Sequence, residues 1–157
     1  MAIVWTNKRE VDARFRKLEY DYNQKAASWL CRLGELVVKY AKENGNYTDR
    51  TANLRNSIGY IVVQSGKVIA ESFTGGASPV TEGGDSNAAM ESGRSYARRV
   101  ASEYSAEKTY LVWVAGMEYA AYVEAKNYDV LQGSGDWVES QAKRQMESFK
   151  RWLMSRT

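Results

Sequence analysis

The 157-residue sequence contains no histidine, one cysteine and one proline. Without histidine the chain lacks the commonest general base and the commonest metal ligand, so histidine-dependent triads and zinc sites are excluded. Cys31 has no second cysteine for an intrachain disulfide, and its place in an apolar helical stripe is typical of a packed small hydrophobe. No stretch approaches the roughly 18 apolar residues of a membrane span, and residues 1–9 lack the pattern of a signal peptide. We therefore expect synthesis in the cytoplasm and no membrane partner.

The remaining polar residues form no catalytic pattern. Glu118 and Glu124 are the carboxylates nearest to an expected strand end, but nothing in the sequence marks a sugar cleft beside them. The glycine pairs at 75–76 and 83–84 lack the Gly-x-x-x-x-Gly-Lys pattern of a phosphate loop, and no serine lies in a Gly-x-Ser-x-Gly elbow. We therefore expect no enzymatic activity, no cofactor and no metal, since a hydrolase here would have to work without histidine or metal.

Charge is distributed unevenly along a chain whose net charge is only +3. Residues 1–57 contain 11 Lys and Arg against 7 Asp and Glu, residues 58–137 contain 6 against 10, and residues 138–157 contain 5 against 2. The simplest explanation of basic ends and an acidic middle is solvated helix faces. The alternative is a pair of complementary patches that meet between subunits, as in a head-to-tail ring.

The first third of the chain has the apolar period of a long amphipathic helix. Between Lys8 and Lys42 the apolar residues recur every three or four positions, at Val11, Phe15, Leu18, Tyr22, Ala26, Trp29, Leu33, Val37 and Tyr40. Gly45 then provides a stop. A continuous helix over this range would be roughly 52 Å long, whereas a compact domain of this size is about 40 Å across. We expect either a bend, at Gly34, or a projecting end that needs a partner.

The middle of the chain predicts a hairpin followed by a loop. Residues 58–63 and 67–73 read as two strands joined by the two-residue turn Ser65-Gly66. Residues 75–87 contain four glycines and the only proline, which predicts a flexible loop. A loop of this length is either a connector or an assembly element.

A second helix, a third strand and a final helix are expected after this loop. Residues 88–104 are predicted to be helical with Tyr104 inward, and residues 109–115 form a strand with apolar residues on both faces. One helical layer covers one of those faces, so the other needs further intrachain structure or another subunit. Asp136, after a Gly-Ser-Gly break, is predicted to cap the final helix.

These elements predict an α+β fold. The N-terminal and C-terminal helices would pack on a small mixed or antiparallel sheet with a hairpin, in a single domain over residues 1–157.

Two short segments, residues 48–58 and 115–124, carry the clearest signals. In the first, Thr51 or Asp49 could cap a single helical turn through Asn56. In the second, Tyr119 and Tyr122 flank two alanines, which allow close backbone approach and suit a packed contact between chains. Glu124 directly follows this apolar and aromatic run, so its carboxylate must stay solvated or find donors, because burying it unpaired costs several kcal/mol.

With these motifs the chain resembles the phage tail-completion, or head–tail joining, family of the minor tail component type. Members of that family have a Thr-Gly-x-Leu-Arg-x-Ser-Ile motif and a Tyr-Ala-x-Tyr-Val-Glu motif between a long N-terminal helix and a C-terminal helix. The matching residues here are Thr51, Asn53, Leu54, Arg55, Asn56, Ser57, Ile58, Tyr119, Ala120, Tyr122, Val123 and Glu124. Ala52 stands where the family usually has glycine, and Ala125-Lys126-Asn127 replaces an aromatic-Gly pair, which affects local turn geometry more than the fold.

The resemblance implies a non-enzymatic virion or prophage component. Such a protein would form a homo-oligomeric ring, often a hexamer, with connector and tail-tube proteins as partners, and would join the tail to the head. It would be located in the virion and, during assembly, in the bacterial cytoplasm. The motif or interface residues would be Thr51, Leu54, Arg55, Ser57, Tyr119, Tyr122 and Glu124.

We expect Arg55 and Glu124 to lie near each other and to fix the motif loop against the sheet, with structural support as their first role and ring contacts as the second. The alternative function is a nucleic-acid-binding module that uses the basic terminal helices. Its bases would stack on aromatic side chains beside Arg50, Arg55, Arg98 and Arg99. The aromatics and arginines do not alternate on one expected strand, so this function ranks second and nucleic acid is not an expected partner.

Overall fold

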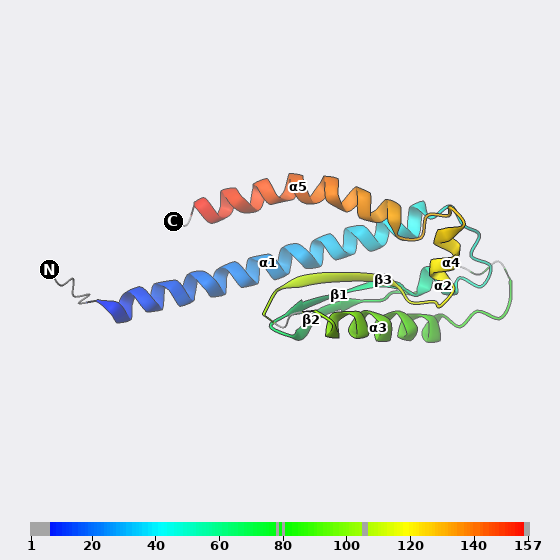
Figure 1. Cartoon of the computed structure of the whole chain (residues 1–157), viewed down its shortest axis with the longest axis horizontal. Helices are drawn as coiled ribbons and strands as arrows, with labels where there is room; N and C mark the ends of the chain where they lie inside the picture. Colours follow the sequence, from blue (N-terminus) through cyan, green and yellow to red (C-terminus); the bar gives the residue numbers. More distant parts are fainter. Residues whose placement is uncertain (1–6, 78, 80, 105–106, 156–157) are drawn as a thin grey trace.

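The computed structural model describes residues 7–77, 79, 81–104 and 107–155 and shows a sheet between two layers of helices (Figure 1). Helix α1 packs on one face of the sheet, α3 packs on the other, and α5 lies along α1. The elements are α1 (Lys8–Asn44), α2 (Asn53–Asn56), β1 (Ile58–Gln64), β2 (Lys67–Ser72), α3 (Ser86–Ser102), β3 (Tyr110–Ala115), α4 (Ala120–Ala125) and α5 (Gln132–Met154). The predicted α+β class is confirmed.

The sheet is antiparallel, with strand order β2-β1-β3. β1 and β2 form the predicted hairpin, and Gln64 pairs with Lys67 across the Ser65-Gly66 turn. Both turn residues have positive φ angles, 51° and 73°, which match the right-handed twist of a hairpin. β1 is the central strand, and its first six residues are all buried.

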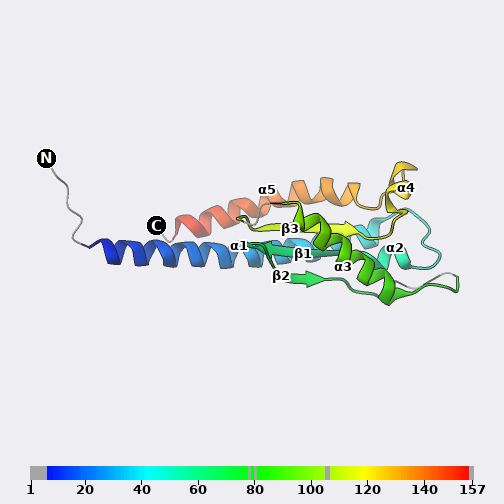
Figure 2. The same cartoon turned by 60° about the horizontal axis from the view of Figure 1, so that its bottom comes forward.

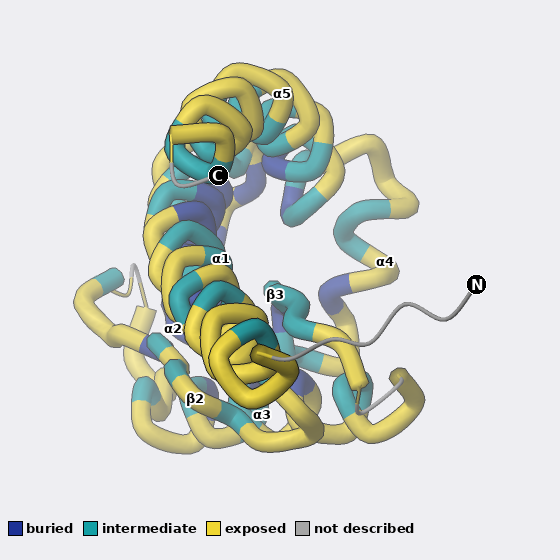
Figure 3. The backbone as a smooth tube through the Cα atoms, turned by 90° about the vertical axis from the view of Figure 1, so that its left-hand side faces the viewer, coloured by how far each residue is buried: buried dark blue, intermediate teal, exposed yellow. Residues whose placement is uncertain are grey.

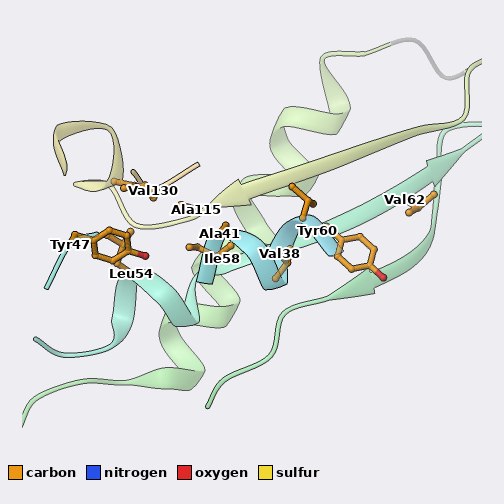
Figure 4. Close-up of a cluster of buried hydrophobic side chains, with 11 residues drawn as sticks. Val38, Ala41, Tyr47, Leu54, Ile58, Tyr60, Val62, Ala115 and Val130 are labelled. Carbon is orange, nitrogen blue, oxygen red and sulfur yellow. The ribbon is translucent and has the colours of Figure 1, made fainter. Parts of the chain in front are cut away.

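Each face of β1 carries its own apolar core. Ile58, Tyr60 and Val62 face α1 and join Val37, Val38 and Ala41 in a cluster that extends to Leu54 and Val130 (Figure 4). Ile61 and Val63 face the other side and pack with Phe73, Ala97, Val112 and Val114 beneath α3. Alternate residues of a strand point to opposite faces, so apolar residues at every position require cover on both sides. Intrachain helices supply that cover, and no second subunit is needed for the two faces.

Helix α1 is longer than the sheet it packs on. Its 37 residues correspond to a length of about 55 Å at 1.5 Å per residue. The Gln64 side-chain amide at the hairpin end donates to the carbonyl of Asn23 at 3.1 Å, and the buried residues of α1 all follow Asn23. Residues 8–22 therefore project beyond the sheet (Figures 1 and 2). A projecting end, one of the two alternatives expected from the sequence, is confirmed.

The C-terminal part of α5 accompanies this projection. Trp137 stacks on Tyr40 with ring centroids 5.1 Å apart, and Phe149 meets Tyr22 edge-on at 5.5 Å. We call residues 8–22 of α1 together with residues 145–154 of α5 the arm, and we call the sheet with α2, α3 and α4 the body.

Three details of the sequence-based assignment are wrong. α3 begins at Ser86 because Asp85 is its cap, with Oδ1 accepting from the backbone N–H of Ala88 at 2.9 Å. Tyr104 lies after the end of α3 and is 63% exposed, so it is not an inward residue. α5 begins at Gln132 rather than after Asp136, because carboxylates outside the helix cap it, as described below.

Two glycines let α3 lie close against the sheet. A Cβ atom at Gly93 would collide with the carbonyl oxygen of Ser57, and one at Gly116 would collide with the backbone of Gly93. Helix and sheet backbones therefore touch at this point without an intervening side chain.

We expect Gly93→Ala to lower the free energy of unfolding by about 1–3 kcal/mol because the methyl group overpacks this contact. Helix propensity alone would raise the free energy of unfolding by about 1 kcal/mol for the same change. The sign of the measured change therefore distinguishes overpacking from helix propensity. Gly135→Ala in α5 is the matched control, since a Cβ there meets no atom within 4 Å and the change should stabilise. Urea unfolding measures both variants, and a stabilised Gly93→Ala protein would contradict the close contact.

Candidate functional site

The two sequence motifs meet at one end of the sheet. β1 begins and β3 ends at the same end of the sheet because the strands are antiparallel, with Ile58 opposite Ala115. The backbone N–H of Gly116 lies 3.1 Å from Oγ of Ser57 and 3.3 Å from its carbonyl oxygen. Ser57 is fully buried, and its hydroxyl donates to the carbonyl of Leu54 at 2.8 Å. Ser57 thus links α2 to the turn after β3.

Arg55 holds the connection between α1 and α2. Its Nη2 donates to the carbonyl of Gly45 at 2.8 Å and to that of Tyr47 at 3.3 Å, and its guanidinium lies 4.8 Å from the centroid of the Tyr47 ring. The buried Asp49 accepts from the backbone N–H of Arg55 at 2.7 Å, so Asp49 caps the α2 turn as one of the two predicted alternatives. Burial raises the pKa of Tyr47 to about 12, against the opposing effect of the Arg55 charge.

Ala52 precedes α2 with a φ angle of 61°, in the left-handed region. This is the position where the resembled motif usually has glycine, the residue that adopts such an angle without strain. Alanine here therefore adopts a backbone angle that glycine adopts more easily.

Glu124 has a different role from the one expected. Its Oε2 accepts from the backbone N–H groups of Val130 at 3.1 Å and Leu131 at 2.9 Å, and its Oε1 accepts from Gln132 at 3.3 Å. Asp129 accepts from the backbone N–H of Gly133 at 2.9 Å. These N–H groups lie at and just before the start of α5, where backbone N–H groups have no partner within the helix. The helix dipole also favours negative charge at this end.

The predicted pairing of Arg55 with Glu124 is wrong. No ion pair joins them among the residues that the structure describes, and each is held by its own set of backbone groups. Backbone partners explain the difference, because a buried carbonyl or N–H without a partner costs as much as a lost hydrogen bond.

The predicted loop lies against the first motif. Asn56 accepts from the backbone N–H of Ala77 at 3.2 Å, and Asn53 accepts from that of Asp85 at 3.0 Å. The N–H of Thr81 donates to the carbonyl of Arg50 at 2.8 Å. Sequence reasoning missed these roles of Asn53 and Asn56. Two amide side chains within a short motif were the only available signal, because asparagine readily pairs with loop backbone.

A surface hollow of about 470 Å³ brings residues of both motifs together, and we call it the motif groove. Thr51 and Leu54 line it from the first motif, and Tyr119 and Tyr122 line it from the second. Tyr122 is 65% exposed, and Lys126 lies over its ring at 5.2 Å. Burial raises the pKa of Tyr119, and the nearby Asp49 charge adds to this effect. Ser57, Arg55 and Glu124 do not line this groove but hold the backbone around it.

Among the described residues, no helix has the length and apolar character needed to cross a membrane. The same part of the chain contains no group of three or more His, Cys, Asp or Glu side chains arranged to hold a metal ion.

The order of a long N-terminal helix, the first motif, a hairpin, a third strand, the second motif and a C-terminal helix agrees with the order expected from the tail-completion proteins that the sequence resembles. The model of the family described as "Bacteriophage HK97-gp10, putative tail-component" matches residues 9–125. The chain belongs to this family of phage tail components. The match includes both motifs and ends one residue after Glu124. Neither the curated proteins nor the solved structures contain a significant match.

We expect Glu124→Gln to lower the free energy of unfolding by about 1–2 kcal/mol, because a neutral amide loses the charge-assisted bonds to the start of α5. Glu118→Gln removes the same charge from an exposed residue of the same segment and should change stability by less than about 0.5 kcal/mol. Urea unfolding followed by circular dichroism compares the two variants. Equal losses would argue against the capping role.

Proposed function

We propose that this chain is a non-enzymatic structural component of a phage or prophage tail. It self-associates into a ring, with a hexamer as the expected form, and joins the tail to the head connector. Its partners are then connector and tail-tube proteins, and its place is the virion after assembly in the bacterial cytoplasm. The observation that carries the proposal is the family match together with an arm that projects beyond the sheet and exposes large apolar side chains.

The arm presents apolar side chains to solvent. Phe15 is 66% exposed and Tyr20 is 63% exposed, although both are on the helix that forms the core further along. A projecting amphipathic helix gains little from folding on its own, because most helix stability in proteins comes from packing an apolar face. Contact with another subunit would bury these rings.

Charge supports contact between arm and body of different copies. The arm contains 7 Lys and Arg against 5 Asp and Glu, whereas segment 58–137, which supplies most of the body, contains 6 against 10. The net charges of the arm and of this segment therefore have opposite signs, and the arm projects from one end of an elongated molecule (Figure 1). Two different complementary surfaces produce head-to-tail contacts, which close into a ring when the rotation allows.

The nucleic-acid alternative has less support from the arginine contacts. Arg98 donates to Glu71 at 2.6 Å, and Arg55 donates to two backbone carbonyls. Arg99 lies over the ring of Tyr96, so a base that stacked beside Arg99 would have one aromatic ring to stack on. Phosphate binding needs guanidinium groups that are not already paired. Retention of DNA with a steep loss of affinity in salt would nevertheless favour this function over the structural one.

We expect Phe15→Ser to shift the sedimentation profile of the purified protein towards smaller species, because the arm loses an apolar contact between copies. Ile69→Ser is the matched control: Ile69 is 44% exposed on β2, in the body. Circular dichroism checks that both variants keep their helices. The proposed role of the arm fails if Phe15→Ser sediments like the wild type, and self-association fails if the wild type is monomeric at every concentration and salt.

Joining is tested in the phage that encodes the chain. A stop codon early in this gene should give filled heads and separate, complete tails in electron micrographs, since neither half depends on the joint for its own assembly. Supplying the chain from a plasmid should restore whole particles. Normal virions without the chain would exclude the joining role.

A further inference from the structure

The outer edge of β3 is open. In the part of the chain that the structure describes, β3 pairs with β1 alone, so its other edge has no strand beside it. Two adjoining hollows of about 530 and 300 Å³ follow this edge; the first is lined by residues 112–115 and the second by residues 110–113. Consecutive residues of a strand point to opposite faces, so a hollow that touches all of them lies along the edge itself. In Figure 3, β3 lies between α1 and α4, below α5.

The walls of this edge groove are apolar. Tyr96 and Val100 of α3 form one wall, and Ala120, Ala121 and Leu131 form the other. Among the described residues, Glu124 is the only charged residue that lines it, and its carboxylate already accepts three backbone hydrogen bonds. An open strand edge between apolar walls fits an uncharged, extended peptide that adds a strand, because main-chain bonds supply affinity and the walls receive alternate side chains.

Residues 1–6 have the chemistry of such a strand. The segment Met-Ala-Ile-Val-Trp-Thr has no charged side chain, and four of its six residues are β-branched or aromatic, the types enriched in strands. Its length equals the six residues of β3. It lies outside the described residues and directly precedes the arm.

The segment is too short to pair with β3 of its own chain. The hairpin end at Gln64 contacts Asn23, and Val63 beside it pairs with Tyr110, so this end of β3 lies level with Asn23. α1 runs along the strands, and Lys8 lies 15 residues earlier, about 22 Å further out. Seven extended residues reach at most roughly 25 Å, which covers that gap but not the additional 20 Å or so along β3.

We infer that residues 2–6 of one copy add as a fourth strand to the outer edge of β3 in a neighbouring copy. This inference rests on the proposed self-association and supplies its contact. Donor segment and acceptor groove are different surfaces of the same chain, so the contact runs head to tail. Alternate side chains of the added strand then lie against the two walls, beside Val100 on one face of the sheet and beside Leu131 on the other.

Disulfide trapping tests the pairing in the full-length chain. Both partners carry Cys31→Ala, which removes the only native cysteine. A Val4→Cys chain is mixed with a larger, tagged Leu111→Cys chain, and non-reducing electrophoresis measures the mixed dimer. We expect at least a fivefold higher yield than with a tagged Ile69→Cys chain, whose cysteine lies on β2 at the opposite edge of the sheet.

Ile3→Pro in the Val4→Cys chain provides the second variant, because proline cannot donate to a strand ladder. Position 3 precedes α1, so the fold should be retained while the mixed dimer falls to the level of the β2 control. Equal yields at Leu111 and Ile69, or no effect of Ile3→Pro, would overturn the inference.

Sedimentation of a chain without residues 1–6 separates this inference from the proposed function. Loss of oligomers that the wild type forms supports the inference. Unchanged oligomers overturn it and leave self-association in place, with another extended segment, from a different tail protein, as the occupant of the groove. A wild type that stays monomeric and gives no mixed dimer overturns both.

Discussion

The buried hydroxyl of Ser57 is the point on which the arrangement depends. It donates to Leu54 in α2 and lies within hydrogen-bond distance of the N–H of Gly116 after β3, while its carbonyl oxygen faces Gly93 of α3. Three elements distant in sequence thus meet on one residue. A larger side chain at Gly93 or Gly116 would separate α3 from the sheet, and the two motifs would no longer be held against each other.

The charged residues around Ser57 form hydrogen bonds with backbone groups rather than ion pairs with one another. Asp49, Glu124 and Asp129 accept from N–H groups, and Arg55 donates to carbonyls. Each such bond to a charged group contributes on the order of 1.5–3 kcal/mol, more than a typical exposed ion pair. The motif groove therefore has rigid walls made by residues behind it, while its tyrosines remain available for contact. Rigid presentation of a small surface suits a component of an assembly, because little further ordering is needed on binding.

The molecule has two kinds of uncovered surface at different places. The arm exposes aromatic rings beyond the sheet, and β3 exposes a strand edge between apolar walls. Natural proteins usually cover or charge a strand edge, because an open one pairs with other chains. An edge that is instead flanked by apolar side chains, in a phage tail component, is consistent with a surface that is closed only in the assembly.

The sequence by itself determined α1, through an apolar period that only a helix can bury on one face. Short apolar runs and the Ser65-Gly66 turn likewise determined the hairpin and β3, and with them the α+β class. The sequence also indicated the two motifs, and Asp49 as one of two candidate caps for α2, and the structure then decided for Asp49. Tertiary structure alone decided the partners of Arg55 and Glu124, the start of α5 at Gln132 and the close contact of Gly93 with Ser57. Those features depend on backbone groups that carry no side-chain identity, so no pattern of residues could reveal them before the chain was folded.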